Sequence, residues 1–264
     1  MALSTKSKQT NRQSAPIITL DKHANMIERH SIELIKKYLD HLDETPKSAV
    51  DRIYADLYRR ITNLELPPGV PLTRVDLCKE YNVSQTPVRE ALLRLEQVGL
   101  IKVRPQSGTE VSYIDIQQLE QNHFLREALE FEVVRCLSLH QDSRLLSHLT
   151  MLVDMQESLI GGNAEDINLF SKLDRLFHSS MFDAVGQSQL YELICSRSGH
   201  MDRIRRLHLP SEGKVRGVIL SHRKIIQSIA SGDPIQAVDS MREHLSGTLS
   251  KVEEIKKTYP EFFL

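Results

Sequence analysis

The sequence has little of what a secreted, disulfide-bonded or membrane-spanning protein requires. Its three cysteines, Cys78, Cys136 and Cys195, are far apart and form no Cys-x-x-Cys pair. This spacing argues against a disulfide framework or a thiolate metal site, and it favours a reducing compartment. No apolar run approaches the roughly 20 residues that a membrane helix needs, and the first residues lack the apolar core of a signal peptide. We therefore expect a cytoplasmic protein with no membrane segment.

Tryptophan is absent, aromatic residues make up only 5% of the chain, and the formal net charge is −1. This balance provides no general affinity for nucleic acid, so a DNA-binding function must depend on where individual basic residues lie. The 264 residues, 40% of them hydrophobic, are enough for two domains that each have a core of their own.

The pattern along the chain divides it into four parts. Residues 1–46 are expected to form a polar, disordered arm and an extra helix. Residues 47–113 carry three short helical patterns followed by two β segments. Residues 114–258 are helical throughout, and residues 259–264 form a tail. The fold class is therefore mostly α, with a small mixed domain before an all-α domain.

The second part has the order of a winged helix-turn-helix. The expected helices cover 50–64, 74–80 and 84–97, and the expected strands cover 100–103 and 110–113. A Pro-Pro-Gly sequence at 67–69 separates the first two helices, and Gly99 ends the third. Three helices followed by a hairpin make up the winged form of this DNA-binding motif.

The third of these helices carries the residues expected to read DNA. Ser84 is a good N-cap and Pro87 lies in the first turn, where its missing N–H does no harm. Ser84, Gln85 and Thr86 therefore project from the start of the helix, and in helix-turn-helix proteins this end of the second helix meets base edges.

Basic side chains near this helix are expected to hold phosphates or groove edges. They are Arg74, Arg89, Arg94 and the wing residue Arg104. An ion pair with Glu90 is the alternative for Arg94, and a capping role is the alternative for Thr86. The partner these residues predict is double-stranded DNA.

The last large part is predicted to be a bundle of six antiparallel helices. The expected segments are 115–139, 143–160, 164–184, 187–207, 212–231 and 234–257. Glycine and proline residues separate them, as at Gly161-Gly162 and Gly232-Asp233-Pro234.

Four residues of the bundle form a candidate metal site. Asp174 and His178 are four residues apart, so they share one face of a helix. His222 and His244 each lie about ten residues from the turn at 232–234, so an antiparallel helix pair brings them level. One carboxylate and three imidazoles suit Zn²⁺, Ni²⁺ or Mn²⁺ and leave positions open for a ligand. Ordinary core or surface histidines, with an Asp–His pair on a solvated face, are the alternative.

These motifs also carry a family resemblance. Residues 50–113 resemble the winged-helix domain of the GntR family of bacterial transcription regulators, and residues 115–255 resemble the FCD effector domain of its FadR-like subfamily. The matching motifs lie at 66–69, 83–92, 126–130, 174–178 and 222–245.

The resemblance implies a homodimer whose helical domain binds an effector and holds a divalent metal through Asp174, His178, His222 and His244. The effector it implies is a small carboxylate, with a sugar acid as one candidate. Arg126 matches the recurrent arginine of the family, and its guanidinium suits two carboxylate oxygens. An intrahelical pair with Glu130 is the alternative for Arg126.

The resulting hypothesis is a dimeric regulator, a repressor, that binds a palindromic operator. The sequence departs from the family at Gln85, which replaces an arginine, and at Val75 beside Arg74. Because glutamine favours adenine edges where arginine favours guanine, we expect an operator altered at that position. A metal-dependent hydrolase and a structural DNA-associated protein with no effector are the alternatives.

Overall fold

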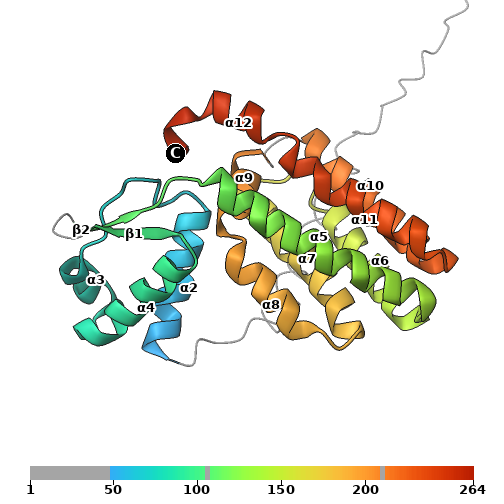
Figure 1. The fold of residues 1–264 in the computed structure, drawn as a ribbon, viewed down its shortest axis with the longest axis horizontal. Coiled ribbons are helices and arrows are strands. Elements are labelled where there is room, and N and C mark those ends of the chain that lie inside the picture. The colour runs from blue at the N-terminus through green and yellow to red at the C-terminus, as the bar shows by residue number, and fades with distance from the viewer. Residues whose placement is uncertain (1–47, 105–107, 209–211) are drawn as a thin grey trace, which may run out of the picture.

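The computed structural model describes residues 48–104, 108–208 and 212–264. The predicted arm and helix within 1–46 and the tip of the predicted hairpin lie outside the described residues. The described part has a small unit of three helices and one hairpin beside a larger unit of helices (Figure 1). The predicted mostly helical class, with an N-terminal winged helix-turn-helix, is confirmed.

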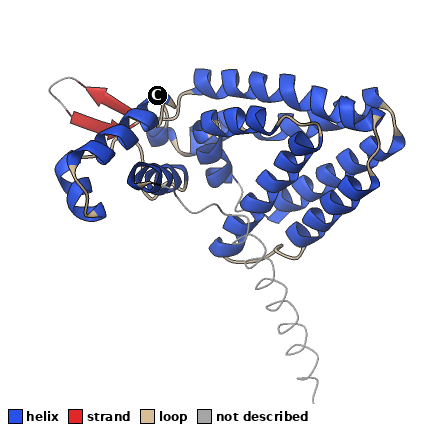
Figure 2. Cartoon of the chain, turned by 90° about the horizontal axis from the view of Figure 1, so that it is seen from below, coloured by secondary structure: helices blue, strands red, loops and turns tan. Residues whose placement is uncertain are grey.

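The small unit contains α2 (Ala49–Thr62), α3 (Arg74–Tyr81), α4 (Gln85–Gln97), β1 (Ile101–Arg104) and β2 (Gly108–Val111). The Ser48 and Thr73 side chains cap α2 and α3 by accepting backbone N–H groups of the first turn. Such caps satisfy N–H groups that a helix leaves free, which is why the helices begin where they do. The two strands pair antiparallel from Ile101 opposite Val111 to Arg104 opposite Gly108, and they lie at one end of the molecule (Figure 2).

The larger unit packs its helices around a separate apolar core. Its elements are α5 (Ile116–Leu139), α6 (Ser143–Glu157), α7 (Ala164–Ala184), α8 (Ser188–Arg197), α9 (Gly199–His208), α10 (Glu212–Ser231), α11 (Pro234–Leu249), α12 (Val252–Thr258) and the 3-10 turn η1 (Pro260–Phe262). Phe177, Leu149 and Met241 are fully buried in this core. In the described residues no helix is long and apolar enough to cross a membrane.

Two of the six predicted helices are each split in two. The segment predicted over 187–207 is α8 and α9, and the segment predicted over 234–257 is α11 and α12. The first break falls at Ser198, next to a close contact between Gly199 and the small unit. A Cβ at residue 199 would lie 2.6 Å from a methyl carbon of Leu100. The missing side chain at Gly199 lets α9 begin close to the small unit, a contact that no local pattern reveals.

A buried arginine holds the segment that joins the two units. Arg203 is completely buried, and its Nη1 donates to the backbone oxygen of Ser112 at 2.6 Å. Its Nη2 lies 2.8 Å from Nδ1 of His200, which also accepts the backbone N–H of Asp115 at 3.1 Å. Since Nδ1 accepts both bonds, the His200 ring is neutral with its proton on Nε2.

This joint makes stability depend on pH through His200. Burial, together with the charge of Arg203, lowers the pKa of His200 to about 3 from an ordinary value of 6.5. Below pH 6.5 the His200 ring is protonated in the unfolded chain but stays neutral in the folded protein. We expect His200 to reduce the free energy of unfolding by about 1.4 kcal/mol for each pH unit below 6.5.

The expected measurement is urea unfolding of the parent protein and of His200→Asn between pH 8 and pH 5. Asparagine keeps a hydrogen-bond acceptor but takes up no proton, so the variant loses less stability per pH unit. The same pH slope in both proteins would exclude this role for His200.

Candidate functional site

The exposed end of α4 presents the residues predicted to read DNA. Ser84, Gln85, Thr86 and Arg89 are exposed, while the opposite face of α4 is buried against the core of the small unit. Ser84 occupies the N-cap position, but its side chain makes no capping hydrogen bond. The hydroxyl therefore remains available to a ligand outside the protein.

The four predicted phosphate-binding arginines differ in their surroundings. Arg74 and Arg89 are exposed and form no ion pair with any side chain in the described ranges. Arg94 binds Asp51 at 2.8 Å instead of the alternative partner Glu90. Arg104 on β1 pairs with a carboxylate of β2 at 2.7 Å. Exposed ion pairs of this kind are weak, so a phosphate group can compete for both side chains.

The four predicted metal ligands lie together inside the larger unit. Asp174 and His178 come from α7, His222 from α10 and His244 from α11. One ligand atom from each residue lies within 4.8 Å of all the others. Nε2 of His178 is 3.2 Å from Nε2 of His244, and Nε2 of His222 is 3.4 Å from Oδ1 of Asp174.

The Nδ1 atom of each histidine, on the side of the ring away from the cluster, contacts a side-chain oxygen. Nδ1 of His178 lies 2.6 Å from the Glu130 carboxylate, and Nδ1 of His222 lies 2.9 Å from the Gln156 side-chain oxygen. Both oxygens only accept, so both Nδ1 atoms carry hydrogen.

The third ring is held in the same way. Nδ1 of His244 lies 2.8 Å from the Ser221 hydroxyl, which already donates to a backbone oxygen one turn earlier. The Nε2 atoms of all three rings therefore face the same space. Such outer partners are what orient histidines that bind metals.

The electrostatics of the cluster favour a cation in that space. Burial lowers the pKa of His222 to about 3 and that of His244 well below its ordinary value, so both rings are neutral. Burial opposes ionisation of Asp174, but the nearby His178 and Arg205 outweigh it and lower its pKa to about 2. Nε2 of His222 is buried and has no hydrogen-bond partner in the described structure. Converging lone pairs repel one another unless a cation lies between them, so this donor set fits a divalent metal.

Sequence patterns did not reveal the outer partners Glu130, Gln156 and Ser221. Arg126 and Glu130 form a buried ion pair, the alternative that the sequence left open. A spacing of four residues on one helix was the available signal for this pair. No sequence spacing marks Gln156 or Ser221, because each contacts its histidine from a different helix.

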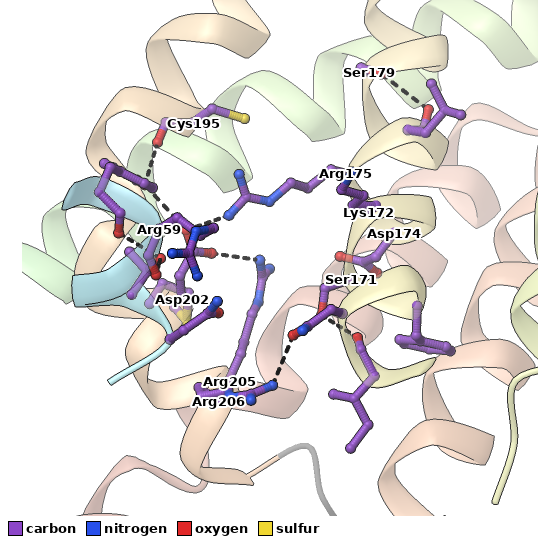
Figure 3. Close-up of a pocket in the computed structure, with 18 of the residues that line it drawn as sticks. Arg59, Ser171, Lys172, Asp174, Arg175, Ser179, Cys195, Asp202, Arg205 and Arg206 are labelled. Atoms are coloured by element: carbon purple, nitrogen blue, oxygen red, sulfur yellow. Dashed lines mark hydrogen bonds and ion pairs between the residues drawn. The ribbon is translucent and has the colours of Figure 1, made fainter. Parts of the chain in front are cut away.

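A cavity of about 990 Å³ adjoins the cluster and is lined by both units. Asp174, His244 and Arg126 line it from the helical unit, and Tyr58 lines it from α2. The Tyr58 hydroxyl lies 3.2 Å from Asp202, which also accepts from Arg175 at 2.7 Å. Figure 3 shows Arg175 and Asp202 pointing toward each other across this space.

Comparisons with known proteins decide the family. The model for bacterial regulatory proteins of the gntR family matches residues 49–111, and the FCD domain model matches residues 123–247. A transcriptional regulator from an unstable DNA locus of Streptomyces ambofaciens is 32% identical over 213 residues, which cover 80% of this chain and 88% of that protein. The chain belongs to the GntR family.

A second relative and one solved structure are also similar to this chain. The transcriptional repressor RspR of Escherichia coli K12 is 26% identical over 80% of this chain and 92% of its own length. The solved structure of E. coli McbR/YncC has the same fold, with a TM-score of 0.63 at 23% identity over 80% of this chain and 99% of that chain.

As a member of the GntR family the chain is a DNA-binding transcriptional regulator and not an enzyme. The metal-dependent hydrolase considered from the sequence is therefore wrong. The cluster of Asp174 and the three histidines lies within the residues that match the FCD domain model.

The stability of this GntR protein depends strongly on the buried carboxylate of Glu130. It is completely buried between Arg126 and His178, and these two partners outweigh the effect of burial and lower its pKa to about 2. Glu130→Ala leaves the buried Arg126 charge without a partner, so we expect a loss of about 3–5 kcal/mol in the free energy of unfolding. Chemical denaturation measures this loss. Glu132→Ala, which removes an exposed carboxylate from the same helix, is the control expected to change stability little.

Proposed function

We propose that this GntR regulator is a homodimeric repressor whose operator binding responds to a small carboxylate, held at a divalent metal in the helical domain. Residues 47–113 bind the operator, and residues 114–258 bind the effector and form the dimer. The observation that carries the proposal is the convergence of three Nε2 atoms and the Asp174 carboxylate beside a cavity lined by both units.

Asp174, His178, His222 and His244 would hold the metal, with Zn²⁺, Ni²⁺ and Mn²⁺ as candidates. When bound, the metal supplies a positive centre with open positions for carboxylate oxygens. Arg126 lines the same cavity and is the proposed partner of the effector carboxylate. Its pair with Glu130 fixes the direction of the guanidinium, and an arginine can still donate to a second acceptor.

On the DNA side, the exposed start of α4 would enter the major groove. Ser84, Gln85 and Thr86 would approach base edges there. The basic side chains that would hold phosphates are Arg74, Arg89, Arg94 and Arg104. A twofold dimer would bind a palindromic operator, with one half-site for each α4.

The cavity provides a physical route between the two functions. Tyr58 belongs to α2, which packs against α4, and its hydroxyl reaches Asp202 and the backbone oxygen of Cys195 in the helical unit. A ligand in the cavity can therefore change how α2 packs on α9. Couplings between two sites commonly amount to about 1–3 kcal/mol.

The test uses operator fragments that the protein captures from the genomic DNA of its own organism. Fluorescence anisotropy would give the operator Kd with lactate, gluconate and glucuronate, before and after EDTA treatment. We expect at least one carboxylate to change the Kd by about 5–150-fold. The response should disappear in metal-free protein and return with Zn²⁺. A response that persists without metal, or none to any carboxylate, contradicts the proposal, and light scattering that gives a single-chain mass contradicts the dimer.

A further inference from the structure

Three basic side chains that line the cavity already pair with acids, and a fourth, Arg206, donates to the Asn168 side-chain oxygen at 3.0 Å. Arg126 pairs with Glu130, Arg175 donates to Asp202 at 2.7 Å, and Arg59 binds Glu65 at 2.6 Å. Arg175 and Arg59 therefore have little spare charge for a second anionic group, and Arg126 is the proposed partner of the carboxylate at the metal cluster.

Arg205 and Lys214 differ from them. Arg205 on α9 reaches an acid only at 3.5 Å, on Asp202, which is already bonded to Arg175. Lys214 on α10 is half-buried, and among the described side chains no acid lies within ion-pair distance of it. Both residues line the cavity. Burial and the charge of Arg205 lower the pKa of Lys214, which agrees with two like charges close together.

The position of Lys214 relative to the metal cluster follows from Gly247 on α11. A Cβ at residue 247 would lie 3.3 Å from Nζ of Lys214. The ammonium group therefore rests against α11 where glycine leaves room for it. Residue 247 is three residues after His244, on the same face of the helix and about 4.5 Å further along its axis.

We infer that the effector is a dianion, with one carboxylate at the metal cluster and a second anionic group between Arg205 and Lys214. This inference rests on the proposed function and names the chemical class of its ligand. The two anionic groups would lie about one helical turn apart, which suits a chain of two to five carbon atoms between them. A dicarboxylate and a phosphorylated acid share this chemistry.

The experiment is calorimetric titration of the zinc-loaded protein with probes matched in length. Butyrate is compared with succinate, and gluconate with glucarate and 6-phosphogluconate. We expect the best dianion to bind at least about tenfold more tightly than its matched monoanion, since one hydrogen bond to a charged group supplies that much. The glucarate and 6-phosphogluconate arms distinguish a second carboxylate from a phosphate.

Variants assign the preference to the second subsite. Lys214→Gln should remove the preference for the dianion and leave gluconate binding unchanged. Gly247→Ala, whose new methyl group displaces Nζ, should lower dianion affinity without removing a charge. Lys224→Gln is the matched control, because Lys224 lies on the same helix, is paired with Glu243 and does not line the cavity.

Three outcomes would overturn the inference. Equal binding of dianions and monoanions, or an equal loss of both in Lys214→Gln, refutes the second subsite and leaves the carboxylate effector standing. Zinc-loaded protein that binds none of the probes refutes the carboxylate effector and the subsite together.

Discussion

His222→Ala is expected to weaken zinc binding by more than about 100-fold, because replacing even an outer partner of a metal ligand costs about 10–100-fold. The variant removes one of the four converging ligands and leaves only Asp174, His178 and His244 to bind the metal. Competition between the protein and a coloured zinc chelator measures the change. His140→Ala removes an exposed histidine outside the cluster and should bind zinc like the parent.

A second variant separates metal loss from misfolding. The His222 ring stacks on Phe177 with 4.1 Å between ring centroids, so its removal also leaves a cavity in the core. Asp174→Asn keeps the shape of its side chain and removes only the charge, so we expect folded protein with weakened zinc binding. If folded Asp174→Asn and His222→Ala both retain zinc as tightly as the parent, the metal centre is wrong.

Arg89→Ala is expected to lower operator affinity by about 10–100-fold, the range for loss of one good contact to a base or phosphate. Arg89 is exposed on α4 and makes no ion pair within the described residues, so its removal should leave folding unchanged. Anisotropy with the captured operator, together with thermal unfolding, measures both effects. Normal affinity in a folded dimeric variant would contradict the proposed docking of α4.

Gln85→Arg is expected to change the base preference of the regulator. Glutamine pairs with adenine and arginine with guanine in the major groove, so the variant should prefer a guanine at one position of each half-site. Binding to an operator library randomised at that position measures the change. An unchanged base preference would indicate that Gln85 does not face a base.

Local chemistry explains how much of the fold the sequence predicts. Helix α7 begins and ends where the pattern places it, because Asn163 and Asp166 form a capping box and Gly186 adopts the positive φ that ends a helix. The start of α4 is equally local, since Thr86 and Pro87 lie in its first turn. These signals act within a few residues, so they can be read without knowing what the helix packs against.

Sequence patterns did not predict which residues meet between helices. Gly199, the first residue of α9, lies close to the Leu100 side chain of the other unit. Gln156, which binds the His222 ring, lies 66 positions before it in the sequence. Neither partner has a spacing that marks it, because the distance between helices is set by packing and not by periodicity.

The sequence by itself determined most of the helices, the exposed polar end of α4 and the four residues of the candidate metal site, since caps, breaks and helical spacing are properties of short segments. Only the tertiary structure decided that Glu130 neutralises Arg126 and supports His178, and that Lys214 rests against Gly247 beside the cluster. The physical reason is that burial and charge compensation depend on which helices meet, and a charge has its full effect only where packing removes it from water.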